Sequence, residues 1–334
     1  LYPLGDPTFM HPDFSYQPVA QLIATTSKQV VLCLPNQPDL FTAYGEGWAW
    51  DDYPEDYQPE RSRLSVFGNV VNFENKNNQL LVTPNFFTSS QSLVSNNLVW
   101  TRSLHSNVFY NSNKKTTDKL QQVPFITDAD YKVACAIMNA ELHPQKPLVV
   151  MQGVDMSKSY VVKGVPTDQM LHVMMHRSDN FFAEQVVLMA TEKILGTIDE
   201  QKGRDTLRKM IFSTLPQSFQ WADGSGLSRF NLNTPENFVA IMQQMKKEFG
   251  VARIQSVFAN SVTNTIGGYY KNAPGKVYAK TGTLGNQVAL SGIINTNKGK
   301  ELTFSVLVGN HINASSAGVR KAVEQYLIKI MERY

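Results

Sequence analysis

Residues 277–309 read VYAKTGTLGNQVALSGIINTNKGKELTFSVLVG and contain three apolar stretches separated by short polar turns. The stretches cover 277–280, 287–294 and 302–309, and β-branched and other apolar residues dominate them. The turns contain Gly or Asn, and the second is the polar run 295–299. This pattern predicts three consecutive antiparallel strands.

The residues after these strands predict a helix. In the segment 317–334 apolar side chains recur at the spacing of one helix face. Those side chains are Val319, Val323, Tyr326, Leu327, Ile330 and Met331. We expect this amphipathic helix to lie on the three strands.

Helical periodicity also precedes the strands, from about residue 165. We predict helices over 167–177 and 181–195, with Gly196 as the C-cap of the second. Their core positions include Val173, Met174, Phe182, Val186 and Met189. A further helix begins at Pro235, with Thr234 as its N-cap. Its inward stripe is predicted to be Phe238, Ile241, Met242 and Met245.

Residues 1 to about 147 show short strands and loops with little helical period. The run 29–34 predicts a strand, and 64–73 with 80–83 predicts a hairpin across the polar run 75–78. The stretch 45–57 (GEGWAWDDYPEDY) predicts a loop held by its aromatic side chains, in preference to a ligand cage. The fold class is therefore α+β, an antiparallel sheet flanked by helices and preceded by a largely β region.

Composition limits the classes of protein. The 334 residues are 42% hydrophobic and 18% charged, which is typical of a folded chain of one elaborated domain or two to three domains. The net charge of +3 is spread without a basic block, so we expect no nucleic-acid partner. We also expect no transmembrane segment, because no apolar run approaches about eighteen residues. Cys33 and Cys135 lie among apolar neighbours, which favours two buried thiols over a disulfide.

Two short polar motifs interrupt the apolar patterns. The motif SDN (178–180) stands between two predicted helices, and by itself it is typical of an N-cap. The motif KTGT (280–283) closes the first predicted strand. Its glycine lets another backbone lie close, while its lysine and threonines suit a substrate carboxylate. S-D-N and K-T-G accompany S-x-x-K in β-lactamases and penicillin-binding proteins.

Between the two motifs, residues 221–235 read WADGSGLSRFNLNTP. This segment closely resembles the D-G-S-G-L-S-R…N…T-P segment of D-alanyl-D-alanine carboxypeptidase/endopeptidases, which are low-molecular-mass penicillin-binding proteins with large inserted domains. Residues 5–8 (GDPT), 47–53 (GWAWDDY) and 178–184 (SDNFFAE) extend the resemblance. It implies a penicillin-binding, β-lactamase-like transpeptidase fold, with residues 1–163 as a β-rich inserted region and 164–334 as the C-terminal part of the catalytic domain.

The resemblance also implies a chemistry. In that family a serine in S-x-x-K attacks the carbonyl before a terminal D-alanine, its lysine accepts the proton, and an acyl-enzyme forms and is hydrolysed. Carried onto this chain, Ser178 would pass a proton towards the leaving amine and Asn180 would hold the substrate amide. Lys280 would set the field around Ser178. The expected partners are peptidoglycan peptides and β-lactam antibiotics, in a periplasmic or extracytoplasmic location, without a cofactor.

The substrate-binding residues implied by the resemblance are Thr281, Gly282 and Thr283. The two threonines would bind the terminal carboxylate, and the N–H of Thr283 would donate to the oxyanion. The nucleophile is missing from this scheme, because S-x-x-K occurs once, at 112–115 (SNKK), in a polar run that predicts a loop. We therefore expect the nucleophile upstream of residue 1, and residues 1–334 alone to be inactive.

Other interpretations remain open. A non-catalytic peptidoglycan-binding protein would keep the fold without the serine. A class A β-lactamase would share S-D-N and K-T-G but would lack both the inserted region and the 223–235 segment. His172 and His176 have the i, i+4 spacing of metal ligands, but no third ligand is evident and ordinary helix histidines are favoured. The acidic residues of 51–56 favour a solvated loop over a cation site.

Overall fold

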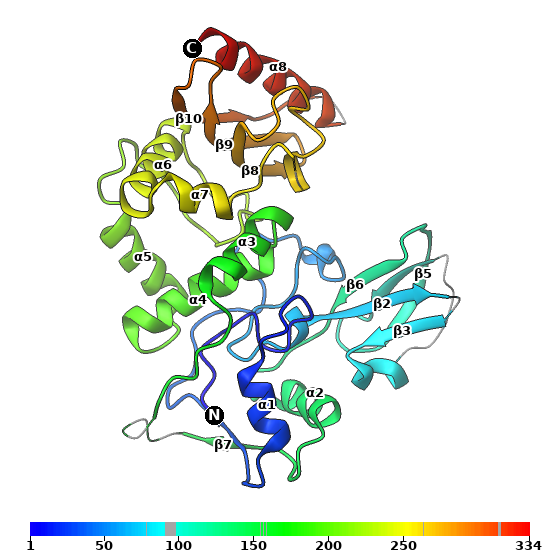
Figure 1. Ribbon diagram of the computed structural model, residues 1–334. Helices are drawn as coiled ribbons and strands as arrows, with labels where there is room; N and C mark the ends of the chain where they lie inside the picture. Colours follow the sequence, from blue (N-terminus) through cyan, green and yellow to red (C-terminus); the bar gives the residue numbers. More distant parts are fainter. Residues whose placement is uncertain are drawn as a thin grey trace. The chain divides into compact units, whose positions relative to one another are not determined.

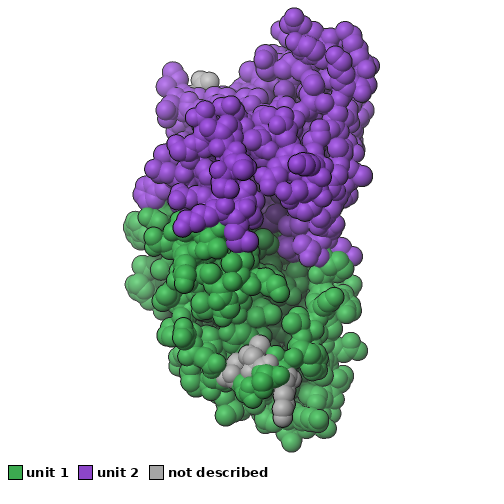
Figure 2. Space-filling view, turned by 90° about the vertical axis from the view of Figure 1, so that its left-hand side faces the viewer, with its two compact units in different colours: residues 1–166, 180–207 green, residues 167–179, 208–334 purple. Residues whose placement is uncertain are grey.

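The computed structural model describes residues 1–77, 79–90, 98–153, 155, 157, 159–262, 264–312 and 315–334. It divides into two compact units, which are coloured separately in Figure 2. Unit 1 comprises residues 1–166 and 180–207, and unit 2 comprises residues 167–179 and 208–334.

Unit 2 is built on a three-stranded antiparallel sheet in the order β10-β9-β8 (Figure 1). Its strands are β8 (Val277–Leu284), β9 (Gln287–Asn295) and β10 (Glu301–Val308). Its helices are α3 (Thr167–Arg177), α6 (Pro235–Phe249), α7 (Val251–Val257), α8 (Ala317–Arg333) and the short 3₁₀ helix η5 (Asn264–Ile266). Helix α5 (Glu200–Ile211), which the sequence did not predict, carries the chain from unit 1 into unit 2. The predicted antiparallel sheet with flanking helices is confirmed.

Helix α8 covers one face of this sheet, as its periodicity predicted (Figure 1). Val323, Leu327 and Met331 are buried against Leu290 and Phe304 of the strands. Burying each of these side chains stabilises the fold by about 2 kcal/mol relative to leaving it in water. Tyr326 departs from the predicted stripe. It is 61% exposed because it lies at the margin of the face rather than over the sheet.

Helices α6 and α7 pack on the sheet's other face through a smaller core. This core contains Met242, Ile254, Val257, Phe258 and Ile293. Helix α6 begins at Pro235 as predicted, and the Thr234 hydroxyl accepts the N–H of Asn237 at 3.2 Å. Of its predicted stripe only Met242 is fully buried. Helix α7 was not predicted; it follows Gly250, whose φ of 76° ends α6.

The described residues of unit 1 form three small sheets rather than one large one. Strand β2 (Val70–Lys76) pairs antiparallel with β3 (Gln79–Thr83) and β6 (Leu120–Pro124), β4 (Leu98–Arg102) pairs antiparallel with β5 (Phe109–Lys115), and β1 (Val31–Leu34) pairs parallel with β7 (Val149–Gln152). Its helices are α1 (Pro18–Thr25), α2 (Lys132–Leu142), α4 (Asn180–Leu195) and the 3₁₀ helices η1 (Trp50–Asp52), η2 (Phe67–Asn69) and η3 (Asn85–Ser90).

The core of unit 1 contains a cluster of aromatic rings. The rings of Phe73 and Trp100 stack with centroids 4.3 Å apart, and Phe87 lies between Phe109 and Phe125. Buried Ile137 and Met138 join this core from α2. Helices α1 and α2 contradict the expectation of strands and loops in the first 147 residues. They are short and contribute only a few buried side chains each, so their periodicity is weak.

The predicted hairpin is confirmed by β2 and β3, except at its beginning. Residues 64–69 do not form a strand, because Phe67, Gly68 and Asn69 all have positive φ (54°, 65° and 56°). Three consecutive left-handed residues cannot continue a pleated ladder. Within the predicted turn, Asn78 lies outside the described residues. The predicted strand at 29–34 is shorter and begins at Val31.

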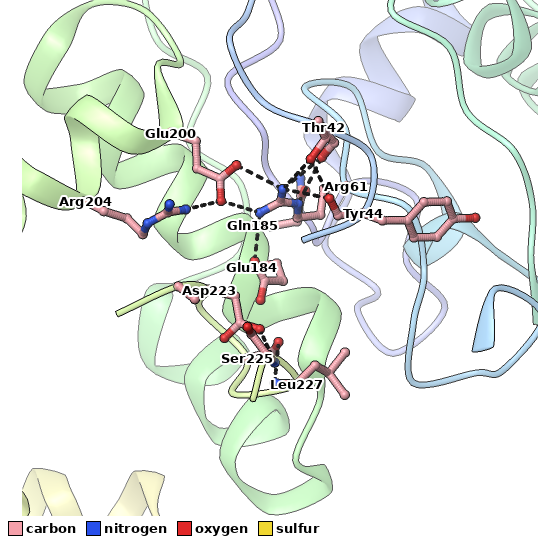
Figure 3. Close-up of polar contacts among 12 residues, drawn as sticks. Thr42, Tyr44, Arg61, Glu184, Gln185, Glu200, Arg204, Asp223, Ser225 and Leu227 are labelled. Atoms are coloured by element: carbon pink, nitrogen blue, oxygen red, sulfur yellow. Dashed lines mark hydrogen bonds and ion pairs between the residues drawn. The ribbon is translucent and has the colours of Figure 1, made fainter. Parts of the chain in front are cut away.

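Buried guanidinium groups hold the irregular segments of unit 1, and Figure 3 shows that of Arg61. Arg61 donates to Glu184 at 3.1 Å and to Glu200 at 2.7 and 3.0 Å, and the Arg61 and Glu184 side chains are each 1% exposed. Arg63 pairs in the same way with Asp39 at 2.7 and 2.5 Å and with Glu192 at 3.0 Å. Charges this deeply buried are stable only when paired and hydrogen-bonded.

This network changes the face that α4 buries. Glu184 and Gln185 are buried beside Phe182, whereas the predicted core positions Val186 and Met189 are only half-buried. The Gln185 side chain donates to the carbonyls of Gly5 and Ser62 at 2.9 and 2.7 Å. Helix α4 therefore holds neighbouring loops through polar contacts. Such contacts cannot be detected from the spacing of apolar residues in the sequence.

Two further predictions have their outcome in this unit. Cys33 and Cys135 are both free thiols, but only Cys135 is buried. In the 45–57 loop, Tyr53 is pinned by a 3.0 Å hydrogen bond to the carbonyl of Arg102, whereas Trp50 is 76% exposed. No helix among the described residues is long and apolar enough to cross a membrane.

We expect the variant Arg61→Met to lower the free energy of unfolding by about 3–5 kcal/mol, because it leaves the buried Glu184 carboxylate without its cation. Chemical denaturation measures the change. The matched control is Lys132→Met, which removes an ion pair whose side chains are 77% and 61% exposed. Equal effects of the two substitutions would contradict this role of burial.

Candidate active site

Ser178 lies in the link between α3 and α4, in a conformation that serine rarely adopts. Its φ is +60°, in the left-handed region. The link is closed by the N–H of Asp179, which donates to the carbonyl of Met174 at 2.9 Å. Arg177 also donates to the Asp179 carboxylate at 2.8 Å. Such strained positions persist only where surrounding contacts hold them, and they cluster at functional sites.

Helix α3 is fixed to α7 within unit 2, and this contact positions Ser178. Arg253 of α7 forms a two-pronged ion pair with Asp168, with a shortest distance of 2.7 Å. His172 Nδ1 donates to the carbonyl of Ser256 at 2.8 Å. Leu171 and Met175 pack against the core between α7 and the sheet.

Lys280 on β8 meets Ser178 directly. Its ammonium donates to Ser178 Oγ at 2.5 Å and to the carbonyl of Thr281 at 2.7 Å. Burial disfavours the charged form of this amine and lowers the pKa of Lys280 from 10.5 to about 8. The two residues, 102 positions apart in the chain, are thus brought into contact.

Alternation along β8 separates the remaining residues of the KTGT motif. Lys280 and Gly282 point to one face, while Thr281 and Thr283 point to the other face, towards α8. Gly282 is opposite Ala289, and a Cβ added at Gly282 would lie 3.2 Å from the Cβ of Ala289. The glycine therefore permits tight pairing of β8 with β9.

Strand β8 is the edge strand of its sheet. Part of its outer edge is already hydrogen-bonded to another segment of the protein, and the part that contains Thr283 comes after it. At residues 277 and 279 they bond to 259–261, with the N–H of Ala279 donating to the carbonyl of Ala259 at 2.9 Å. Because alternate residues direct their N–H groups to the same edge, the N–H of Thr283 also points to this outer edge. An edge N–H of this kind is a donor for an extended ligand.

Sequence reasoning missed Arg320, which joins the KTGT motif from α8. Its guanidinium donates to the hydroxyl of Thr283, 37 residues earlier in the chain. Arg320 and Thr281 also line one small pocket on the α8 side of the sheet. Nothing in the local pattern around residue 320 distinguishes this arginine from the other cations of α8.

The 221–235 segment folds around one buried carboxylate (Figure 3). Asp223 accepts the N–H groups of Gly226 and Ser228 at 2.8 and 2.6 Å and the amide of Asn231 at 2.7 Å. Arg229 then ties this loop to the β8–β9 turn by donating to the carbonyl of Gly285 at 3.1 Å. The segment is therefore a loop that is held by internal hydrogen bonds and anchored beside the end of β8.

Asn180 begins α4 and belongs to unit 1. Its amide group donates to the carbonyl of Tyr57 at 2.9 Å. This contact uses the nitrogen of the carboxamide and leaves its oxygen as an acceptor.

Ser112, the serine of the S-x-x-K at 112–115, does not lie in the predicted loop. Residues 112–115 belong to strand β5. Side chains three positions apart in a strand point to opposite faces, so Ser112 and Lys115 are directed apart rather than stacked as on a helix. This motif is not arranged as a nucleophile with its base.

The alternative metal sites are not supported by side-chain geometry. The rings of His172 and His176 stack 3.8 Å apart, and burial, with the nearby His172, lowers the pKa of His176. Across the described ranges no group of three or more His, Cys, Asp or Glu residues is placed to hold a metal ion.

Comparison with known proteins identifies the family. The model of the D-Ala-D-Ala carboxypeptidase 3 (S13) family matches residues 2–330. The chain belongs to this family. It is also similar to a curated protein of Dictyostelium discoideum named penicillin-sensitive carboxypeptidase A, with 25% identity over 186 residues. That alignment covers 51% of this chain and 35% of the relative, so the chain spans about a third of the curated relative that it matches.

Solved structures support the fold. The chain is similar to penicillin-binding protein 4 of Haemophilus influenzae, with a TM-score of 0.73 and 17% identity over 99% of this chain and 81% of that one. A structure of the same protein complexed with a β-lactam gives a TM-score of 0.67, with 17% identity and the same shares covered. The penicillin-binding fold expected from the motifs is thereby confirmed.

The lowered pKa of Lys280 predicts a pH-dependent stability. Because the folded pKa of about 8 is below the unfolded value of 10.5, the unfolded state binds more protons between these pH values. The free energy of unfolding of the wild type should therefore rise, relative to Lys280→Met, by up to about 3 kcal/mol as the pH rises through this window. Urea unfolding of both proteins at several pH values measures it, and a constant difference would contradict the burial of a charged amine.

The Asp223 contacts predict a second stability effect. Replacing Asp223 by Ala removes a buried acceptor of three hydrogen bonds and should lower the free energy of unfolding by about 3 kcal/mol or more. The exposed Glu236→Gln variant, which also removes one negative charge from unit 2, serves as the control. Thermal unfolding of both variants compares them, and a wild-type melting temperature for Asp223→Ala would contradict the anchoring role.

Proposed function

We propose that this protein is a serine-type D-Ala-D-Ala carboxypeptidase/endopeptidase that acts on peptidoglycan peptides through an acyl-enzyme. On this proposal β-lactams inhibit it by forming the same kind of covalent adduct. The observation that carries the proposal is the 2.5 Å contact between Lys280 Nζ and Ser178 Oγ beside the open edge of β8. Membership of the S13 family supports the reaction class.

The contact explains how Ser178 would act. An ammonium is a donor only, so the Ser178 oxygen accepts from Lys280 and its own hydrogen is free for another acceptor. A hydroxyl oriented in this way can pass its proton to the leaving amine while it is hydrogen-bonded to a cation. With a pKa of about 8, Lys280 keeps its charge at neutral pH. Lys280 and Ser178 are thus the proposed electrostatic and proton-transfer pair.

The remaining site residues have proposed roles in substrate binding. Thr281 and Thr283 bind the terminal carboxylate, and the edge N–H of Thr283 donates to the oxyanion. Gly282 keeps β8 free of a side chain that would displace the strand. Asn180 accepts the amide N–H of the substrate with its carboxamide oxygen. An extended D-Ala-D-Ala terminus would then lie along the edge of β8 like an added strand.

The proposal also assigns regions of the chain to parts of the enzyme and implies a cellular location. Residues 164–334 would supply the C-terminal part of the catalytic domain, and residues 1–163 the inserted β-rich region. Peptidoglycan as substrate places the protein in the periplasm or another extracytoplasmic compartment. The S-x-x-K at 112–115 is unsuited to acylation, so the proposal requires a serine that residues 1–334 do not supply.

The test of the proposal is acylation of the full-length protein by a fluorescent penicillin, together with release of D-alanine from a pentapeptide. We expect a covalent adduct, and we expect Lys280→Ala to slow its formation by about 100-fold or more, because it removes the cation that orients Ser178. The control is Lys271→Ala, which removes an exposed lysine of the loop preceding β8.

Two outcomes would count against the proposal. If the full-length protein forms no adduct and releases no D-alanine, the enzymatic function is wrong and a non-catalytic peptidoglycan-binding role remains. If Lys280→Ala is acylated at the wild-type rate while its fold is intact, Lys280 is not part of the site.

A further inference from the structure

The last turn of α3 carries a buried histidine two residues before Ser178. His176 is 8% exposed, and its ring stacks on that of His172 with the centroids 3.8 Å apart. His176 also shares a hydrogen bond with the backbone of Phe258. Because the N–H of Phe258 donates to the carbonyl of Ile254 at 2.9 Å, it is the carbonyl of Phe258 that accepts from the His176 ring. His176 therefore ties the end of α3 to the residues that follow α7.

Those residues connect the histidine to Lys280. The segment 258–261 lies along the outer edge of β8, where the carbonyl of Ala259 accepts the N–H of Ala279 at 2.9 Å. Lys280 is the next residue of β8, and its ammonium donates to Ser178 Oγ at 2.5 Å. The contacts thus form a closed ring that runs from the histidine through this segment to Lys280 and back to α3 through Ser178. A shift of the buried ring away from β8 opens this ring of contacts.

The hydrogen bonds of both histidines can be made by neutral rings. His172 Nδ1 donates to the carbonyl of Ser256 at 2.8 Å, and His176 donates to the backbone as described. If both rings were protonated, two cations would be stacked with centroids 3.8 Å apart. Burial disfavours the charged form of His176 and the nearby His172 opposes it further, so the pKa of His176 is lowered. The dipole of α3 favours a cation in its last turn, but the direction of this shift means that burial outweighs the dipole.

The charged groups around the two rings give a buried imidazolium little compensation. The titratable groups of the surrounding elements are Asp168, Arg177 and Asp179 in and after α3, Arg253 on α7, and Tyr278 and Lys280 on β8. The 3₁₀ helix η5 also packs on α3, and its sequence NTI contains no titratable residue. Arg253 already binds Asp168 through two donors, and Arg177 donates to Asp179 at 2.8 Å. Both carboxylates are therefore engaged by other cations.

We infer that His176 is a positioning residue that holds Ser178 against Lys280 while its ring is neutral and releases Ser178 when the ring is protonated. The physical reason is that a buried charge must be paired or hydrated, and the ring reaches water only by leaving the 258–261 segment. Acid therefore inactivates the protein through the end of α3. This inference rests on the proposed function, in which Ser178 passes a proton to the leaving amine. It assigns regulation of that step to a residue outside the S-D-N and K-T-G motifs.

The experiment measures acylation of the full-length protein by a fluorescent penicillin at pH 4.5 and pH 7.5. We expect the ratio of the rate at pH 4.5 to the rate at pH 7.5 to be higher in His176→Asn than in the wild type, by about fivefold or more. Asparagine keeps a side-chain donor for the Phe258 carbonyl but has no proton to gain. Ionisations of other groups affect both proteins alike and cancel in this comparison.

His172→Asn provides a test of opposite sign. It removes the neighbouring charge that opposes protonation of His176, so His176 should gain its proton at a higher pH. The acid loss of the acylation rate should therefore begin at a higher pH than in the wild type. The matched control is His105→Asn, which replaces an exposed histidine of unit 1 and should leave the pH profile unchanged. A purely structural role of the two histidines would lower the rate by the same factor at every pH.

Hydrogen exchange of the Asp179 amide tests the release of Ser178 without catalysis. This N–H donates to the carbonyl of Met174 at 2.9 Å and closes the link that contains Ser178. After correction for the intrinsic pH dependence of exchange, its protection in the wild type should fall between pH 7.5 and pH 4.5, and in His176→Asn it should stay constant. Thermal unfolding verifies that each variant is folded, and His172→Asn keeps the inference testable if His176→Asn is not.

The outcomes separate this inference from the proposed function. If acid slows acylation of His176→Asn as much as that of the wild type, the inference is wrong and the proposed function stands. If His105→Asn changes the profile as much as His176→Asn, the loss of any histidine is responsible and the inference is wrong. If the wild type reacts with penicillin at neither pH, the proposed function fails, and constant protection of the Asp179 amide would then refute the release of Ser178 as well.

Discussion

The hydrogen bond from Lys280 to Ser178 is the contact on which the geometry of the candidate site depends. A desolvated ammonium must find acceptors, and this one finds the Ser178 hydroxyl and the Thr281 carbonyl, at 2.5 and 2.7 Å. The first of these holds a serine with positive φ against the edge of the sheet. Helix α7 completes the arrangement, because it binds α3 through Asp168 and His172 and packs on the sheet.

The same chemistry recurs on the opposite face of β8. There Arg320 donates to the Thr283 hydroxyl, as Lys280 does to Ser178 on the first face. In both pairs the cation uses the oxygen of the hydroxyl and leaves its hydrogen for another group. The strand edge between them thus has oriented donors on both sides. An extended ligand with a carbonyl and a terminal carboxylate offers the acceptors that such an edge requires, which supports the function proposed above.

Unit 1 is organised on another principle. Its sheets are small and its connecting segments are long, so buried guanidinium groups take the place of regular ladders in holding the chain. Arg61 and Arg63 each join a loop to helical carboxylates, and Arg102 donates to the carbonyls of Pro124 and Ser103 at 2.8 and 2.9 Å. Such hydrogen-bond and ion-pair networks stabilise the fold when every group in them is paired, and the loss of any one side chain weakens them. This explains why α4 buries Glu184 and Gln185 rather than a purely apolar stripe.

The sequence by itself determined the three strands of unit 2, the amphipathic helix α8, the Thr234 cap of α6 and the family motifs. Each depends on residues that are a few positions apart. Their periodicity and local hydrogen bonds need no partner from a distant part of the chain. The motifs implied that Lys280 lies near Ser178, but only the tertiary structure decided the 2.5 Å hydrogen bond between them, the lowered pKa of Lys280, the contact of Arg320 with Thr283, and the burial of His176 and Glu184. These features depend on desolvation and on partners far away in the chain, and no pattern within one segment contains that information.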